Sequence, residues 1–137
     1  MAADLTPEQT AFLRDNPYYG VVSTVRRDGS PHASIVWVDI DDDGKPGWNS
    51  NLDGAKPKHV ARNPRVTLIV FDPGDAYHWV KVEGRAELVE EGADAQIDKL
   101  AEKYLGVDTY PWRDPARSRV RIAITPGRVE SAGFEGA

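Results

Sequence analysis

The sequence predicts a mostly-β protein in which six antiparallel strands curl into a barrel, accompanied by one substantial helix and two short ones. Runs rich in β-branched residues follow one another in hairpin order and are separated by Asp-, Gly- and Pro-containing turns. Consecutive hairpins favour an antiparallel sheet that closes on itself. Strands and helices do not alternate along the chain, which argues against a doubly wound parallel sheet.

The bulk composition is that of one globular domain. The chain has 137 residues, 40% of them hydrophobic and 28% charged, and it contains no cysteine. We therefore expect a single domain over residues 1–137, with frayed ends at 1–4 and 132–137. The start of the chain lacks a signal-peptide pattern and no run approaches a membrane span, so we expect a cytoplasmic protein that does not enter a membrane. A net charge of −5 argues against nucleic-acid binding.

The first forty residues predict a short helix and a hairpin. Thr6-Pro7-Glu8-Gln9 is a helix start with a capping box, and Asn16-Pro17 ends that helix. Strands are expected over 20–26 and 31–40, joined by a turn at Asp28-Gly29. Period-2 alternation places Val36, Val38 and Ile40 on the core face of the second strand.

The middle of the chain predicts three more strands. A solvated turn at Asp41-Asp42-Asp43-Gly44 lacks the spacing of a calcium loop, and a short strand follows over 47–50. Residues 65–71 are nearly all apolar, which predicts a central strand buried on both sides. A long strand is expected from Tyr77 to Val89, where Gly84 indicates a bulge or a close backbone approach.

The last third predicts the main helix and the closing strand. Apolar residues recur at helical spacing over 92–105, and Gly106 is a good helix stop. Residues 107–115 are expected to be irregular, and the closing strand over 119–130 to be broken near Pro126-Gly127. Two charged rows are expected to pair across strands on the outside of the barrel, with an anion-binding role for the arginines as the alternative: Glu83, Arg85 and Glu87, and Arg117, Arg119 and Arg121.

A short basic segment is the one local anomaly of charge. Lys56, Lys58, Arg62 and Arg65 lie close to a single acid, Asp53, in an otherwise acidic chain. Lys56 falls at the expected start of a helix, where the helix dipole disfavours a cation unless an anion is bound. Ser50 and Asn51, at the end of the preceding strand, can add neutral donors. On these residues alone, an anion site and a solvated basic helix remain equally open.

The common catalytic and nucleotide-binding motifs are missing. We find no GxGxxG, GxxxxGK[ST], GxSxG or HExxH pattern. The three histidines, His32, His59 and His78, do not have metal-ligand spacing, so no metal site is expected.

Several short motifs, in this order, resemble the pyridoxamine-phosphate-oxidase-like family of flavin- and deazaflavin-binding split barrels. The run 20–38 resembles the opening hairpin of that family, with Thr-x-x-x-Asp-Gly-x-Pro-His from Thr24 to His32. Asn49-Ser50, Lys56-x-Lys58 and Asn63-Pro64-Arg65-Val66 resemble its phosphate-binding segment. Later motifs are Val82-Glu83-Gly84-Arg85-Ala86 and Ile124-Thr125-Pro126-x-Arg128-Val129, so the resemblance covers roughly residues 5 to 132.

The resemblance implies a six-stranded Greek-key split barrel that forms a homodimer, with two cofactor sites at the subunit interface. It implies a phosphate end lined by Ser50, Asn51, Lys56, Pro57 and Lys58. It places near the ring system His32, Ser34, Val36, Val70, Phe71, Tyr77, His78 and Trp79. Trp112 and Arg113 are expected to reach the partner's site, whereas Trp37 and Trp48 are assigned to core or dimer packing.

The short chain lacks the extra basic residues that bind the substrate phosphate in the oxidases, so it looks more like the subgroup that uses the deazaflavin F420. The expected activity is hydride transfer between reduced F420 and a small conjugated or heteroaromatic acceptor. Because the cofactor supplies the hydride chemistry, no side chain is obligatory as acid or base, and Tyr77 and His78 are the candidate proton donors. The alternatives are an FMN-dependent oxidoreductase, a cofactor-binding protein without turnover, and a structural protein without a ligand.

Overall fold

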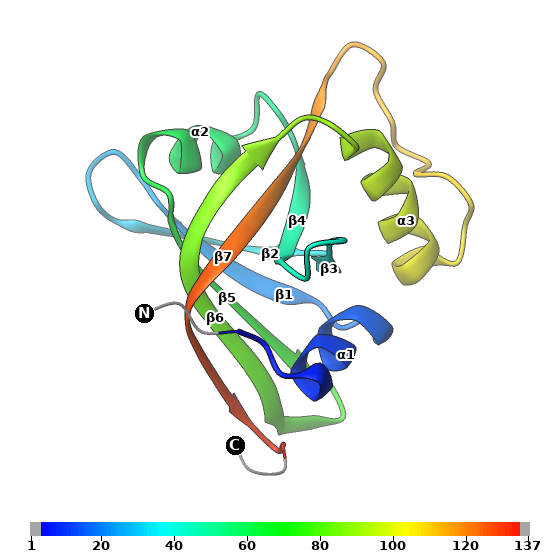
Figure 1. Ribbon diagram of the computed structural model, residues 1–137. Helices are drawn as coiled ribbons and strands as arrows, with labels where there is room; N and C mark the ends of the chain where they lie inside the picture. The colour runs from blue at the N-terminus through cyan, green and yellow to red at the C-terminus, as the bar shows by residue number, and fades with distance from the viewer. Residues whose placement is uncertain (1–3, 135–137) are drawn as a thin grey trace.

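The computed structural model describes residues 4–134, which form one seven-stranded antiparallel sheet and three helices (Figure 1). The strand order is β2-β1-β5-β6-β7-β4-β3, and every pairing is antiparallel. This confirms the predicted mostly-β antiparallel class. The elements in chain order are α1 (Pro7–Asp15), β1 (Gly20–Val25), β2 (Pro31–Val36), β3 (Asp39–Ile40), β4 (Pro46–Asn51), α2 (Ala55–Arg62), β5 (Arg65–Asp72), β6 (Asp75–Val89), α3 (Ala93–Leu105) and β7 (Arg119–Ala132).

The seventh strand arises because the strand expected over 31–40 divides into β2 and β3. Val38 leaves the ladder, and its N–H donates to the hydroxyl of Tyr104 on α3 over 2.9 Å. Its carbonyl accepts a hydrogen bond from Lys103 over 2.8 Å. Because only Trp37 and Val38 separate β2 from β3, the two edges of the sheet lie close together and the sheet curls into a barrel.

The barrel encloses the core, and one glycine allows two strands to approach closely. Trp48, Leu68 and Ile122 are among its fully buried side chains. A Cβ on Gly84 would overlap the carbonyl of Thr125, and the register of β6 against β7 shifts between Glu83 and Gly84. Both interpretations offered for Gly84, a bulge and a close backbone approach, are confirmed.

Two expectations about the central and closing strands were wrong. β5 is buried on one face only: Val66, Leu68 and Val70 are covered, while Phe71 on the other face is 43% exposed. A continuous apolar run does not distinguish a strand with two buried faces from one with a single buried face. β7 continues through Pro126-Gly127, because the bulge opposite Gly84 absorbs the irregularity.

The closing strand also extends further than expected. Ser131 and Ala132 pair with Val80 and Trp79, and the Phe134 ring packs 5.3 Å from that of Phe12. These residues are therefore held against the sheet rather than frayed. The expectation of frayed ends at 1–3 and 135–137 lies outside the described residues.

The helix boundaries follow the sequence signals. Thr6 and Gln9 form the predicted capping box of α1, and Asn16 is its C-cap. α2 begins after Gly54 with Lys56 in its first turn and Pro57 next to it. α3 ends at Gly106, which has φ of 72°. No helix within residues 4–134 is long and apolar enough to cross a membrane.

The expected pairing of the two charged rows is wrong. Arg119 donates to the side chains of Asn49 and Asn51 on β4, and Arg121 donates to the carbonyl of Glu91, so neither arginine pairs with the acids of β6. The remaining arginine of the row, Arg117, pairs with Asp53 over 2.8 Å. Glu83 and Glu87 have other partners, Arg128 at 3.9 Å and Lys45 at 3.5 Å.

Candidate functional site

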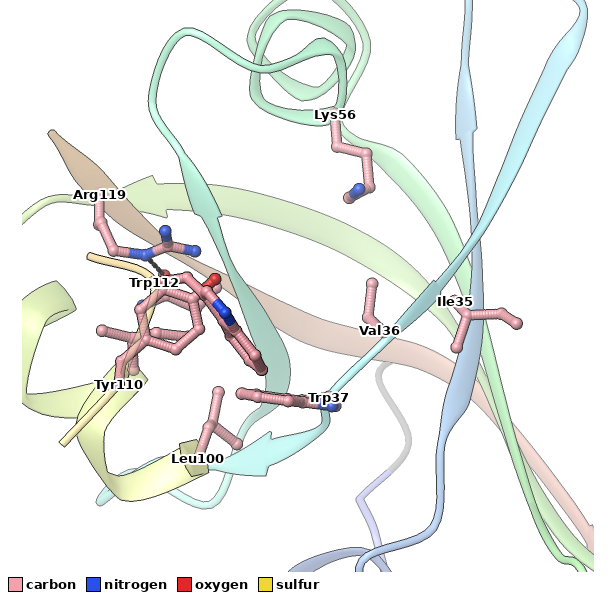
Figure 2. A pocket seen from close by; sticks show the side chains of 10 residues that line it. Ile35, Val36, Trp37, Lys56, Leu100, Tyr110, Trp112 and Arg119 are labelled. Carbon is pink, nitrogen blue, oxygen red and sulfur yellow. Dashed lines mark hydrogen bonds between the residues drawn. The ribbon is translucent and has the colours of Figure 1, made fainter. Parts of the chain in front are cut away.

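A cavity of about 220 Å³ lies between the end of β2, β4, the start of α2, and α3 with the loop that follows it (Figure 2). Its floor is apolar, its walls carry three aromatic rings, and two cationic side chains enter it from different elements. The lining residues are Ile35, Val36, Trp37, Asn49, Lys56, Ile97, Leu100, Tyr110, Trp112 and Arg119. An apolar pocket with a few convergent polar groups is the usual form of a small-molecule site.

Lys56 is the cation on the α2 side of the cavity. It is half-buried, and the burial of its ammonium group lowers the pKa of Lys56 below its ordinary value. No charged neighbour contributes to that shift, so no carboxylate offsets the cost of covering the ammonium. The first turn of α2 has no acidic residue, and Gly54 at the N-cap provides no side-chain cap. Free N–H groups and an unpaired cation therefore coincide at this helix start, which suits an anion.

The aromatic wall is built from β2, α3 and the following loop. The Trp37 ring stacks on that of Tyr104 with centroids 5.3 Å apart and planes 5° apart. Tyr110 meets Trp37 and Trp112 edge-on, at 6.1 and 5.7 Å. The expected assignment of Trp37 to core or dimer packing is therefore incomplete, since this ring also faces the cavity. Flat apolar surfaces of this kind suit a planar ligand.

Arg119 is the cation on the opposite side, and unlike Lys56 it has neutral partners. Its Nε donates to Asn49 Oδ1 over 2.6 Å, and one terminal nitrogen donates to Asn51 Oδ1 over 3.1 Å. The guanidinium lies 5.0 Å from the centre of the Tyr110 ring. Burial lowers the pKa of Arg119, but the group stays charged. These contacts fix the head of Arg119 at the cavity wall.

His32 and Ser34 lie on the inner row of β2, four and two residues before Val36 respectively. The His32 ring meets that of His59 on α2 at 5.0 Å. His32 Nδ1 and Ser34 Oγ are covered yet have no hydrogen-bond partner within the described residues. Such groups normally have partners, so their lack of one points to a missing ligand or water.

The structure brings some of the predicted site residues to the cavity and leaves others beside it. Lys56, Val36 and Trp112 line it directly. Ser50 is buried on β4, and Asn51 is engaged with Arg119. Pro57 packs inward from α2, whereas Lys58 points to solvent.

Six predicted residues lie away from this cavity in the single chain. The side chain of Val70 is in the core, and its strand pairs with β1 on one side and β6 on the other. Phe71 and Trp79 face each other across β5 and β6, and Tyr77 is 84% exposed near the start of β6. His78 packs between Phe12 and Phe134. Arg113 pairs with Asp98 over 2.8 Å and with Asp94 over 3.5 Å, which anchors the loop to α3.

Sequence reasoning missed several lining residues. The sequence indicates Asn49 only as part of a family motif, and no pattern in it predicts that Tyr110, Ile97 and Leu100 line a cavity. The alternation of side chains along β2 places Trp37 on the face opposite the core residues, and this alternation could have indicated that Trp37 does not belong to the core. The approach of the 107–118 loop to β2 and β4 depends on tertiary packing, and no local pattern in the sequence indicates it. Within residues 4–134 no group of three or more His, Asp or Glu side chains is arranged to hold a metal ion.

Comparison with known proteins identifies relatives over most of the chain. A sequence model of the family described as pyridoxamine 5′-phosphate oxidase matches residues 5–132. The pyridoxine/pyridoxamine 5′-phosphate oxidase of Pseudomonas entomophila is 31% identical over 99 residues, which are 72% of this chain but only 44% of that enzyme.

Solved structures with the same fold include an F420 reductase. It is 31% identical, with a TM-score of 0.76, and the match covers 91% of this chain and 98% of the reductase. A conserved hypothetical protein from Mycobacterium tuberculosis is 25% identical, with a TM-score of 0.73, and the match covers 96% and 86% of the two chains.

Proposed function

The chain belongs to the pyridoxamine 5′-phosphate oxidase family, and we propose that it is an F420-dependent oxidoreductase. In this proposal it transfers a hydride between reduced F420 and a small conjugated or heteroaromatic acceptor in the cytoplasm. The observation that carries the proposal is the half-buried Lys56, which enters an aromatic cavity without an acidic partner. A structural lysine at such a position would normally be paired or point to solvent.

The residues of the cavity fit an anionic, planar group. Lys56 and the free N–H groups at the start of α2 would hold a phosphate, and Ser50 lies on the strand just before them. Trp37 and Trp112 offer flat surfaces for a conjugated ring, over a floor that includes Val36. The cavity within one chain is smaller than a whole flavin cofactor, so part of the ligand would extend beyond it.

The cofactor, once bound, supplies the hydride chemistry, and the chain supplies binding and orientation. The two candidate proton donors, Tyr77 and His78, do not line the cavity. We therefore retain the proposal that no side chain of this cavity is obligatory as an acid or base. In a dimer, Tyr77 and His78 would contribute only if they reached the partner's site.

A homodimer is supported by an exposed apolar row on the outer face of the sheet. Ile35, Val21 and Ile69 are direct neighbours across β2, β1 and β5, and Ile35 is 71% exposed. Phe71 extends the same face. Exposed apolar patches of this kind mark association sites. Ile35 also lines the cavity, so a second copy seated on this face would border the cofactor site.

The dimer is tested by placing a charge in the middle of this face. Ile35→Lys should shift the mass measured by sedimentation from two chains to one, because a lysine buried at the interface would be desolvated. Lys81→Ala, on the same face but part of a salt bridge with Glu130, is the matched control and should leave the mass unchanged. A monomeric wild-type protein at micromolar concentration would contradict the dimer.

The choice between F420 and FMN has one supporting observation on each side. The match to the F420 reductase spans nearly the whole of both chains, whereas the match to the curated oxidase spans less than half of that enzyme. The family itself, however, is described by pyridoxamine 5′-phosphate oxidase, so FMN is the second candidate cofactor.

The deciding experiment is a titration of the purified protein with F420 and with FMN, followed by fluorescence. We expect saturable binding of F420 and weaker binding of FMN. Tight FMN binding alone would transfer the proposal to an FMN enzyme, and binding of neither cofactor would overturn it. Tight F420 binding without reduction of any acceptor in a broad panel would instead indicate a cofactor carrier.

A further inference from the structure

Arg119 differs from the arginines that precede it in the partners of its charge. Arg113 and Arg117, on the loop before β7, each pair with an aspartate over 2.8 Å. Arg119 forms no salt bridge within residues 4–134, and its hydrogen bonds go to the neutral side chains of Asn49 and Asn51. The two amides therefore fix the guanidinium but place no carboxylate in contact with it.

The guanidinium keeps donors that can bind a ligand. Its two contacts use the Nε hydrogen and one hydrogen on Nη1, and Nη2 has no hydrogen-bond partner in the part of the chain that the structure describes. Nη1 and Nη2 form the end of the planar fork that binds a carboxylate through two parallel hydrogen bonds. Arg119 lines the cavity on the side away from Lys56 (Figure 2). A carboxylate is thus the ligand group that suits this wall.

The charge of Arg119 is partly covered at a cost. Burial lowers the pKa of Arg119, and the positive charges of Arg113 and Arg117 lower it further. Tyr110 and Asp94 act in the opposite direction, but Asp94 pairs with Arg113 over 3.5 Å. The guanidinium stays charged throughout. A carboxylate bound in the cavity would supply the counter-charge that the chain does not place there.

Aromatic rings lie beside the guanidinium on the same side of the cavity. The central guanidinium carbon is 5.0 Å from the centre of the Tyr110 ring, and the Trp112 ring meets that of Tyr110 at 5.7 Å. Trp112 is 64% exposed, which is unusual for so large an aromatic side chain. A planar ligand paired with Arg119 would cover this ring. The cavity volume of about 220 Å³ suits a single-ring compound, since sites for drug-sized ligands begin at roughly 300 Å³.

One carboxylate on α3 holds the aromatic wall in place. Asp98 accepts from the backbone N–H of Tyr110 over 2.9 Å and from the guanidinium of Arg113 over 2.8 Å. These two donors lie on either side of Trp112, so the loop that carries it is tied to α3 at two points. A wall that is fixed before binding loses less conformational entropy when a ligand binds.

We propose that the α3 side of the cavity is the acceptor subsite, and that the acceptor is a small planar conjugated carboxylic acid whose carboxylate pairs with Arg119. The inference rests on the proposed function, because it names the acceptor class for the same reaction. Lys56, on the other side, stays assigned to the phosphate of the cofactor. Such an acid is reduced by a hydride from the reduced cofactor, added to one carbon of a C=C bond, and a proton from solvent, added to the other.

The probes are cinnamate and cinnamamide, which have the same shape and differ in charge. Each is titrated into the protein without cofactor at pH 7, and binding is followed by isothermal titration calorimetry. We expect cinnamate to bind at least about tenfold more tightly than cinnamamide, because hydrogen bonds between charged groups are the stronger ones. Equal affinity for the two probes, or binding of neither, would overturn the inference.

Two variants test whether Arg119 causes this preference. Arg119→Gln should reduce it to about equal affinity for the two probes, while cinnamamide still binds and shows that the cavity is intact. Asn51→Asp keeps the arginine but places a carboxylate where Arg119 already donates, so the preference should fall here as well. Arg117→Gln is the matched control, because Arg117 pairs with Asp53 and does not line the cavity. A preference that survives in either folded variant, or that falls equally in Arg117→Gln, would overturn the inference.

The cofactor is the other source of a carboxylate, since F420 itself carries carboxylate groups. Titration of cinnamate into the protein saturated with F420 separates the two sources. An acceptor subsite should keep its cinnamate affinity within about twofold. Displacement of cinnamate by F420 would assign Arg119 to the cofactor and overturn the inference.

Failure of this subsite and failure of the proposed function give different results. If F420 binds but cinnamate is not preferred over cinnamamide, the cofactor assignment stands and the acceptor class is wrong. If Arg119→Gln removes a clear preference for cinnamate while neither F420 nor FMN binds, the carboxylate site stands and the oxidoreductase proposal is wrong.

Discussion

The α2 and α3 sides of the cavity both cover polar and charged groups, but they satisfy them differently. On the α3 side, Asp39 is buried and accepts from Lys99 at 2.9 Å and from Gln96 at 3.1 Å. Gln96 Oε1 in turn accepts a hydrogen bond from Asn49 Nδ2, and Asn49 Oδ1 accepts one from Arg119. On the α2 side, and within residues 4–134, Lys56 has no acidic partner, and His32 and Ser34 have covered atoms without hydrogen bonds.

The same contrast holds for two partly buried lysines, Lys103 and Lys56. Lys103 on α3 donates to the carbonyls of Leu13 and Val38, over 2.7 and 2.8 Å, and so connects α1 to the β2–β3 break. Lys56 has no comparable connection. Burial alone therefore does not separate structural from ligand-binding groups. The number of hydrogen-bond and ion-pair partners that a group has within the chain does separate them. This number predicts which substitutions alter stability and which alter binding.

The largest effect on stability is expected from the hydroxyl of Tyr104. It donates to the carbonyl of Tyr18 over 2.6 Å and accepts from the N–H of Val38 over 2.9 Å. Burial raises the pKa of this hydroxyl to about 12, so it stays neutral and keeps both bonds. Tyr104→Phe should lower the free energy of unfolding by about 2–3 kcal/mol, because both backbone groups lose their partner. Urea unfolding followed by tryptophan fluorescence measures it.

The matched control is Tyr19→Phe. The Tyr19 ring lies 5.5 Å from that of Tyr104, but Tyr19 is 54% exposed, so losing its hydroxyl should change the unfolding free energy by less than about 0.5 kcal/mol. Cofactor affinity should remain within about twofold of wild type in both variants, provided the protein is folded. A Tyr104→Phe protein of wild-type stability would show that the α3 network does not hold the barrel.

Much of the fold was predictable because its signals are local. The capping box at Thr6, the stop at Gly106 and the close approach at Gly84 each depend on a few neighbouring residues. The split of β2 from β3 was not predictable, since it depends on Tyr104 and Lys103, more than sixty residues away. The exposed second face of β5 was not predictable, because a run of apolar residues has the same pattern whether one face of the strand is covered or both.

The site was predicted in part for the same reason. Lys56 was identified from its position at a helix start, which is a local feature, and the structure places it in the cavity. Tyr110 was not predicted, because only the packing of the loop after α3 brings it to the cavity beside Trp37. Tyr77, His78 and Trp79 were predicted from the family resemblance alone, and they do not line the cavity.

The second prediction reverses the first, since Lys56→Ala should alter binding and leave stability nearly unchanged. Removing a half-buried cation without a partner costs the folded chain little, so the unfolding free energy should change by less than about 0.5 kcal/mol. F420 affinity should fall by 1–3 kcal/mol, roughly the value of a hydrogen bond to a charged group. Lys58→Ala is the control. Lys58 lies two residues after Lys56 on α2 but is exposed, so its loss should have a smaller effect on F420 affinity. Equal losses in both variants would indicate only a general loss of positive charge.

The smallest expected effect is a pH dependence of stability that comes from the α3 side. Burial lowers the pKa of Lys103 to about 8, below the value of roughly 10.4 for an unfolded lysine. Between these values the unfolded chain binds more protons than the folded one, so the unfolding free energy should rise with pH from about 8 toward 10. Water screens this partly open side chain, which should keep the rise below about 1 kcal/mol. Urea unfolding at pH 7.5 and 9.5 measures it, and Lys103→Met should remove the rise. A rise that persists in Lys103→Met would have to come from other groups, and Lys103 would then be an ordinary paired lysine rather than a covered one.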